Sequence, residues 1–139
     1  MDVVLIDTDV ILDFFFDREP YSEYAASVLS LCALKKIKGY TTPVIISNVY
    51  YLLRKADQHL IIINKLKELL TIIDVVQMDK NAVINALNSS FKDFEDALQN
   101  FAAIEQGEIE IILTRNIKDY KKSTLAILTP ETYVKGRVS

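Results

Sequence analysis

The stretch Val3-Val4-Leu5-Ile6-Asp7-Thr8-Asp9 near the start of the chain decides the fold class. Its first four residues are all apolar, which is typical of a strand that is buried on both faces in a parallel sheet. Thr8 or Asp9 is expected to cap a helix that follows this strand directly. A buried strand that passes straight into a helix indicates an α/β fold.

The rest of the chain repeats this alternation of β-rich and helical segments. Apolar spacing predicts helices over residues 20–37, 49–55, 60–70, 79–87 and 93–107, and a helical turn that starts at Pro130. Apolar runs predict further strands at residues 40–46, 72–76, 109–113 and 126–128. Strands that alternate with helices in this way predict a central parallel sheet with helices on both faces.

The size and charge of the chain bound its possible functions. Hydrophobic residues make up 50% of the 139 residues, enough for a packed core, and we expect one domain that spans residues 1–139. The formal net charge is −3, whereas proteins that bind nucleic acid mainly by counterion release are usually basic. Contact with nucleic acid would therefore be local, mediated by a metal ion, or helped by a partner.

Cysteine and histidine each occur once, as Cys32 and His59. One cysteine excludes an internal disulfide, and the two residues are too few for an ordinary zinc site of nitrogen and sulfur ligands. The same scarcity argues against a histidine-dependent catalytic triad, and His59 is expected at the surface. The chain shows no signal-peptide pattern and no apolar run that is long enough to span a membrane, so we expect a cytoplasmic protein with no membrane partner.

Polar residues follow the predicted strands where those strands end. Asp7 and Asp9 follow the first strand, Ser47-Asn48 follows the second, and the loop 114–119 follows the fourth. A further acidic group at residues 93–96 begins a helix. Ligands of open parallel sheets bind beyond the carboxyl ends of the strands, so we expect these groups to converge there. Their oxygen ligands favour Mg²⁺ or Mn²⁺, and such a site suits metal-assisted attack of water on a phosphodiester.

Each acid also has a structural explanation, which the sequence leaves open. Asp7 and Asp93 are suited to cap the helices that follow them, and Asp96 is then a first-turn acid that the helix dipole favours. Glu95 is expected to be solvated, whereas Asp96 lies beside an inward-facing apolar stripe and therefore nearer the sheet. Asp119 is by itself an ordinary loop residue.

Basic residues form local clusters, two of which are expected near the acidic end of the sheet. One is Arg54-Lys55, and the other is Arg115 with Lys118, Lys121 and Lys122. Such clusters can hold an RNA backbone around a metal site, and a solvated charged face is the alternative for each of them.

Four segments carry a family resemblance: residues 6–13 (IDTDVILD), 46–55 (ISNVYYLLRK), 93–99 (DFEDALQ) and 113–120 (LTRNIKDY). In this order and spacing they resemble the PIN-domain family, in particular the small stand-alone bacterial proteins related to VapC-type toxins. The closing LTPE at residues 128–131 is also similar. The resemblance implies a three-layer α/β/α fold with a central parallel sheet, a Mg²⁺- or Mn²⁺-dependent ribonuclease, and often a toxin–antitoxin setting.

The resemblance also implies site residues. The family's first acid corresponds to Asp7, its acid in the helix before the fourth strand to Asp96, and its last polar position to the loop that holds Asn116 and Asp119. Its second acid is usually a Glu and corresponds to Asn48. An amide can coordinate or accept a hydrogen bond through its carbonyl oxygen, but it brings no charge and cannot act as a general base.

The leading hypothesis is therefore an endoribonuclease that hydrolyses RNA phosphodiester bonds. RNA is the expected substrate, and an antitoxin protein and a second copy of the chain are further candidate partners. The expected catalytic residues are Asp7, Asn48, Asp96 and Asp119, with the metal ion on Asp7, Asp96 and Asp119, and with Thr114, Asn116, Arg54 and Arg115 against the substrate.

Two other readings remain open from the sequence. The first is a PIN-like module that binds RNA or a protein partner with little or no activity, for which Asn48 is the best argument. The second is a phosphatase of the haloacid-dehalogenase type, because Asp7-x-Asp9 after an apolar strand resembles the nucleophile and acid of that class. The chain is short for that class and lacks its downstream Lys and Gly-Asp motifs.

Overall fold

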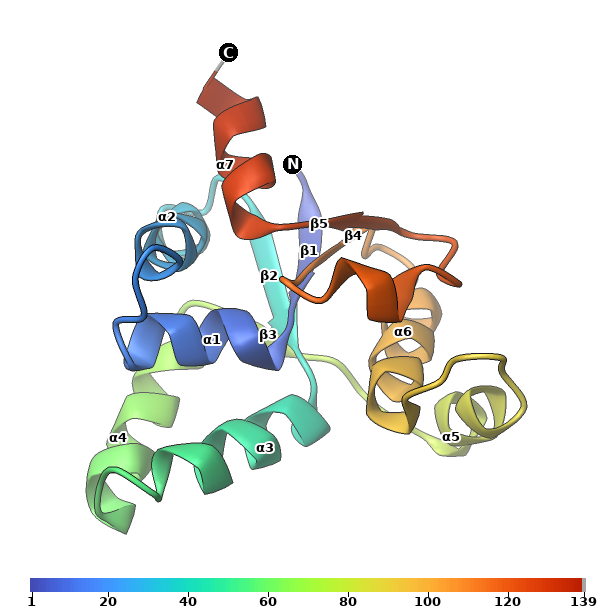
Figure 1. Ribbon diagram of the computed structural model, residues 1–139, viewed down its shortest axis with the longest axis horizontal. Helices are drawn as coiled ribbons and strands as arrows, with labels where there is room; N and C mark the ends of the chain where they lie inside the picture. Colours follow the sequence, from blue (N-terminus) through green and yellow to red (C-terminus); the bar gives the residue numbers. More distant parts are fainter. Residues whose placement is uncertain (139) are drawn as a thin grey trace.

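The computed structural model describes residues 1–138 and contains a five-stranded, fully parallel sheet with helices on both sides (Figure 1). The strands lie in the order β3-β2-β1-β4-β5. Their bounds are Val3–Ile6 (β1), Lys38–Thr41 (β2), Asp74–Val75 (β3), Ile111–Leu113 (β4) and Ala126–Leu128 (β5). The helices are Thr8–Phe15 (α1), Ser22–Ala33 (α2), Pro43–Leu53 (α3), His59–Leu69 (α4), Lys80–Leu87 (α5), Phe94–Gln106 (α6) and Pro130–Val138 (α7), with a 3₁₀ turn η1 at Ile117–Tyr120. The predicted α/β class and parallel sheet are confirmed.

The alternation of side chains along the central strand β1 builds two cores, one on each face of the sheet. Val4 and Ile6 belong to the larger core, which α1, α2, α3, α4 and α7 cover. Leu5 points to the opposite face, where it belongs to a smaller core with Ala102 and Ala103 of α6. The three-layer arrangement therefore follows from a strand that is apolar at every position.

Helix α3 begins earlier than the sequence analysis predicted. Its N-cap is Thr42, whose hydroxyl accepts a hydrogen bond from Ile45 N at 3.1 Å, and Pro43 occupies the first helical turn. Proline is favoured at that position because its missing N–H needs no partner there. The predicted strand 40–46 therefore ends at Thr41, and Asn48 lies within the helix rather than at its start.

Asp7 caps helix α1, where Thr8 or Asp9 was predicted. Its Oδ1 accepts a hydrogen bond from Thr8 N at 2.8 Å. The capping alternatives for Asp7 and Asp93 are thus both confirmed, since Asp93 Oδ1 accepts from Asp96 N at 2.9 Å. The predicted caps Asp79 and Gly107 also stand at the ends of α5 and α6.

The strand order creates a crevice at a defined place. From β1 the chain builds the sheet outward in one direction, through β2 and β3, and then adds β4 and β5 on the opposite side of β1. The switch point therefore lies between β1 and β4. Such a switch point leaves a crevice beyond the carboxyl ends of the two strands, where ligands of α/β proteins bind. Asp7 N donates to Leu113 O at 3.0 Å, which brings the ends of β1 and β4 together. No helix within residues 1–138 is long and apolar enough to cross a membrane.

Candidate active site

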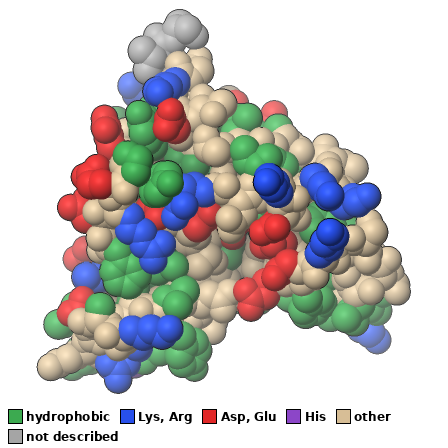
Figure 2. Space-filling model, viewed as in Figure 1, with side chains coloured by type: hydrophobic (Ala, Val, Ile, Leu, Met, Phe, Trp, Pro, Cys, Tyr) green, Lys and Arg blue, Asp and Glu red, His purple; other side chains and the backbone are tan. Residues whose placement is uncertain are grey.

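An acidic cleft of about 530 Å³ lies at this switch point, between α1 and α3 on one side and α6 on the other. Figure 2 shows acidic side chains gathered around the hollow between the two groups of helices. The only basic side chain that lines the cleft within residues 1–138 is Arg18. Its acidic lining residues are Asp7, Asp9, Asp93, Glu95, Asp96 and Asp119.

Asp7 is the most deeply buried acid of the cleft, with 6% of its surface exposed. Its Oδ2 accepts hydrogen bonds from the Thr114 hydroxyl at 2.9 Å and from the Tyr120 hydroxyl at 3.2 Å. Burial and the nearby charge of Asp9 nevertheless raise the pKa of Asp7 from 3.8 to about 6. A carboxylate whose charge is this unfavourable is one that a cation would stabilise.

Asp9 has one carboxylate oxygen in use and one without a partner. Oδ2 accepts from the backbone N of Arg115 at 2.9 Å. Oδ1 is buried and makes no hydrogen bond within residues 1–138. Burial is also the main cause of the raised pKa of Asp9. A buried oxygen without a partner in an otherwise satisfied site calls for an explanation, and a ligand or an ion supplies one.

Asp96 faces Asp7 across the cleft from the first turn of α6. Burial comes first among the causes that raise its pKa to about 7, and the charges of Asp7, Asp93 and Asp119 follow. Tyr120 is fully buried between the two acids, where its hydroxyl donates to Asp7 and lies within hydrogen-bonding reach of Asp96. The sequence analysis did not identify Tyr120, because nothing near it in the sequence distinguishes it from a core aromatic residue.

Asn48 points across the cleft from α3 to α6. Its Nδ2 donates a hydrogen bond to Glu95 Oε2 at 2.9 Å. Glu95 was expected to be solvated, and although it is exposed it lines the same cleft as Asp7 and Asp96. The two partners are 47 residues apart, so no local sequence signal joins them.

The loop after β4 supplies the remaining residues that the sequence analysis placed at the site. Thr114 is fully buried and acts on Asp7 through its hydroxyl rather than by lining the cleft. Asn116 and Asp119 both line the cleft, and the backbone N of Asn116 donates to the Thr114 hydroxyl at 3.0 Å. The structure thus brings Asp7, Asn48, Asp96, Asn116 and Asp119 together.

The two arginines that were predicted to contact substrate lie outside the lining of the cleft. Arg54 ends α3 and donates to Asp57 O at 2.9 Å. Arg115 holds the buried Asp13 with two hydrogen bonds, of 2.7 and 2.9 Å, and its guanidinium stacks 3.9 Å from the ring centroid of Tyr21. This pairing ties the loop after β4 to α1, and Arg115 therefore fixes the position of the backbone N–H that Asp9 accepts.

The donor set of the cleft fits a hard divalent cation in chemistry. All six acids offer oxygen ligands, which Mg²⁺ and Mn²⁺ prefer, and burial together with repulsion from neighbouring acids raises the pKa of Asp7 and Asp96. Within residues 1–138, no three His, Cys, Asp or Glu side chains are grouped closely enough to hold a metal ion as they stand. Binding a cation would therefore require the carboxylates to move toward one another.

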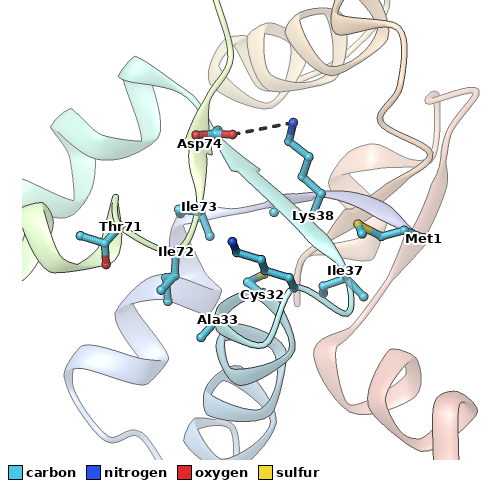
Figure 3. A pocket seen from close by; sticks show the side chains of 11 residues that line it. Met1, Cys32, Ala33, Ile37, Lys38, Thr71, Ile72, Ile73 and Asp74 are labelled. Carbon is cyan, nitrogen blue, oxygen red and sulfur yellow. Dashed lines mark ion pairs between the residues drawn. The ribbon is translucent and has the colours of Figure 1, made fainter.

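A second pocket, of about 310 Å³, lies at the amino ends of β1, β2 and β3 (Figure 3). An ion pair joins Lys38 Nζ to Asp74 Oδ2 at 3.8 Å beside this pocket. Burial raises the pKa of the Cys32 thiol to about 11, so this thiol is not a nucleophile at neutral pH. Lys38 and Asp74 are thus paired and the thiol is unreactive, whereas Lys35 lines the pocket without an ion pair among residues 1–138.

Comparison with known protein sequences gives a family and a relative. The sequence profile of the PIN domain matches residues 3–118 of the chain. Ribonuclease VapC1 of Aquifex aeolicus (strain VF5) is 29% identical over 135 residues, which cover 94% of this chain and 92% of that protein.

Solved structures of similar fold come from toxin–antitoxin systems. One is VapBC2 from Rickettsia felis bound to a DNA fragment from its promoter, with a TM-score of 0.66 at 16% identity over 91% of this chain and 96% of that one. Another is VapC20 of Mycobacterium tuberculosis, described as a toxin that cleaves the sarcin–ricin loop, with a TM-score of 0.63 at 16% identity over 85% of this chain and 95% of that one. At these identities the likeness concerns the fold.

Proposed function

The chain belongs to the PIN-domain family, and from this premise we propose that it is a Mg²⁺- or Mn²⁺-dependent endoribonuclease and the toxin of a toxin–antitoxin pair. The relative VapC1 of Aquifex aeolicus is a ribonuclease. The fold of this chain is similar to that of VapC20, a toxin that cleaves the sarcin–ricin loop. Family membership also removes the haloacid-dehalogenase alternative, in which Asp7 was the nucleophile.

The observation that carries this proposal is the pairing of Asp7 and Asp96 across Tyr120 at the switch point. The pKa values of these two carboxylates are raised to about 6 and about 7, because burial and neighbouring acids make their charged forms unfavourable. A bound cation would stabilise the charged form of both. We assign the cation to Asp7, Asp96 and Asp119. When bound there, a divalent cation polarises a phosphoryl oxygen and lowers the pKa of a water molecule that it holds.

The protein's own groups fix the acids that face the substrate. Thr114 and Tyr120 hold Asp7 Oδ2, and Asp93 caps the helix that carries Asp96. We assign Asn116, which lines the cleft, to a contact with the scissile phosphate. Hydrogen bonds of this kind orient the carboxylates of a metal site, and here the carboxylates must still move closer together to hold one ion.

Glu95 brings to the cleft a carboxylate that the resemblance would place at position 48. The hydrogen bond from Asn48 holds Glu95 toward the cleft, and the residue at 48 therefore acts through its neighbour. In this assignment Asn48 is a positioning residue rather than a ligand. The carboxylate of Glu95 on α6 supplies the negative charge that is missing at position 48.

A binding module without activity is the competing proposal, and two observations favour it. Asn48 brings no charge, and no three acids within residues 1–138 are grouped closely enough for one ion. Such a module would bind RNA through the same cleft without hydrolysing it.

Cleavage of a mixed RNA pool separates the two proposals. Wild-type protein with Mn²⁺ or Mg²⁺ is expected to cleave the pool and to stop when the metal is removed with EDTA. Asp7→Asn and Asp96→Asn are expected to abolish cleavage while circular dichroism shows that both variants fold. No cleavage by folded wild-type protein with any divalent cation would establish the binding module instead.

A further inference from the structure

A second groove opens beside the acidic cleft. It encloses about 500 Å³ and is formed by the loop before α6 and by the segment around η1. Four lysines line it, one from the first segment and three from the second: Lys92, Lys118, Lys121 and Lys122. Figure 2 shows Lys and Arg side chains gathered beside the acidic hollow, on the side that carries this segment.

These four lysines are exposed, and none of them has an ion-pair partner among residues 1–138. Five of the other eight lysines also lack an ion pair within residues 1–138, so what distinguishes these four is that they line one groove. The formal net charge of the chain is −3, so a groove lined by four lysines contrasts with an acidic background. A local concentration of one charge attracts a ligand of the opposite charge.

The lysine groove and the acidic cleft share a border. Asp93 and Asp119 line both of them, and the charge of Asp119 is felt at Asp96. A ligand that has one group in the cleft and extends past Asp119 therefore enters the groove. The opposite side of the cleft offers only Arg18, which already lies 3.5 Å from Asp13.

We propose that the lysine groove binds the sugar–phosphate backbone of single-stranded RNA on one flank of the scissile phosphate, so that the protein holds its substrate from one side. This inference rests on the proposed ribonuclease function. A nucleic-acid strand fits both regions because its phosphates repeat along the chain: one phosphate meets a cation in the cleft, and the following ones meet lysines. Arg115, which the sequence grouped with these lysines, is held by Asp13 and lies outside the groove.

The test is RNA binding in EDTA, which separates the groove from cleavage. Binding of a fluorescein-labelled single-stranded RNA of about 12 nucleotides, within the usual site size of such proteins, is followed by anisotropy over a series of salt concentrations. The groove variant changes its four lysines to Gln. A control variant changes four exposed lysines outside both the cleft and the groove to Gln: Lys35, Lys36, Lys67 and Lys80.

Both variants lose the same charge, so only location distinguishes them. The groove variant is expected to bind RNA at least roughly tenfold more weakly near 0.1 M salt. The slope of its log affinity against log salt is expected to flatten by about 3, since four phosphate contacts are lost and each contributes about 0.7 on single strands. The control is expected to keep most of the wild-type affinity and slope.

Equal losses in the two variants, or none in the groove variant, would overturn the inference even for a protein that cleaves RNA. Failure of the wild type to cleave RNA with any divalent cation contradicts the proposed function instead, and the binding comparison still decides the groove. Tight binding of a poly-glutamate peptide in preference to RNA would assign the lysines to an acidic protein partner and overturn the inference.

Discussion

The two ends of the sheet carry hollows of opposite character. At the carboxyl ends, six acids line a cleft whose only basic lining residue within residues 1–138 is Arg18, and three of these acids have raised pKa values. At the amino ends, a pocket is lined mostly by apolar groups, and its charged lining residues are Lys35 and the ion pair of Lys38 with Asp74. Both hollows contain charged groups, but only the cleft gathers many charges of one sign.

This difference separates a site from a packing defect. Proteins hold like charges together only where the rest of the fold stabilises the arrangement, and such strain is typical of functional sites. The pocket at the amino ends gathers no such set of like charges. Four predictions test whether the contrast is real.

The largest effect is expected on RNA cleavage. Asp7→Asn removes a charge from the cleft and is expected to lower the rate of metal-dependent cleavage roughly 10³-fold or more, because the cation loses several kcal/mol of stabilisation of the transition state. Asp74→Asn removes the same charge from the opposite pocket and is expected to leave the rate unchanged. A comparable loss in Asp74→Asn would show that charge at either end matters and would break the contrast.

The next effect is on stability without metal. Since the pKa of Asp7 is about 6 and that of Asp96 about 7 in the folded protein, against 3.8 for the ordinary side chain, the folded protein binds more protons than the unfolded chain between about pH 4 and pH 7. The free energy of unfolding therefore falls as the pH rises through this window. Urea denaturation in EDTA is expected to show higher stability at pH 5.5 than at pH 7.5.

Asp7→Asn removes the buried charge, and it is expected to stabilise the metal-free protein at pH 7.5 by about 3 kcal/mol at most, since the pKa of Asp7 is raised from 3.8 to about 6 and one pKa unit corresponds to about 1.4 kcal/mol. It should also flatten the pH dependence. Asp74→Asn is the matched control and should change neither quantity. A destabilised Asp7→Asn variant would mean that the hydrogen bonds from Thr114 and Tyr120 outweigh the burial of charge.

The third effect belongs to the amino-end pocket. A Cβ on Gly39 would lie 2.7 Å from Cys32 Sγ and 2.9 Å from Ile73 Cγ2, so Gly39→Ala forces packed atoms apart. Overpacking of this size is expected to lower the free energy of unfolding by about 1–3 kcal/mol. Thermal and urea unfolding measure it. Cleavage per folded molecule should stay at the wild-type value, and a drop in that value would connect the two ends of the sheet.

The smallest effect concerns the contact between α3 and α6. Asn48→Ala releases Glu95, whose carboxylate adds negative charge beside the assigned ligands Asp7, Asp96 and Asp119. The change is expected to weaken Mn²⁺ binding about tenfold, as the loss of an outer partner of a metal site typically does. Calorimetry or Mn²⁺ paramagnetic resonance measures the affinity directly. Asn64→Ala on α4 is an exposed control and should bind Mn²⁺ as the wild type does.

An exchange of the two side chains sharpens this prediction. Glu95→Gln alone is expected to weaken Mn²⁺ binding, and Asn48→Glu combined with Glu95→Gln is expected to restore it, because the cleft again holds one carboxylate and one amide at these positions. A double variant that binds no better than Glu95→Gln would remove Glu95 from the site.

Local features of the fold could be predicted from the sequence because their causes are local. The strand Val3–Ile6 needs only four apolar residues, and the caps Asp79 and Asp93 need only the backbone N–H groups of the turn that follows. Gly107 ends α6 with φ at 91°, a conformation that glycine adopts without strain. The predicted start of α3 was wrong, because the β-rich run 40–46 was interpreted as one strand although it contains the N-cap Thr42 and Pro43.

Contacts between distant segments were beyond the sequence. Asp13 and Arg115 are 102 residues apart, and Tyr120 reaches Asp7 over 113. Each of these side chains has an ordinary local explanation, and only the strand order brings them together. The acids to which the family resemblance assigns a role were therefore predicted as site residues. Tyr120 and Glu95 lie in the same motif segments but act through partners, and they were not predicted as site residues.

Tyr120 has a consequence for observing the protein in solution. The chain contains seven tyrosines and no tryptophan, so no indole emission masks the ultraviolet fluorescence of the phenols. A carboxylate that accepts a hydrogen bond from the hydroxyl of an excited tyrosine quenches the fluorescence of that tyrosine. A cation that draws the carboxylates of Asp7 and Asp96 away from Tyr120 should relieve this quenching. The cleft thus contains its own optical reporter, which needs neither a dye nor a labelled substrate.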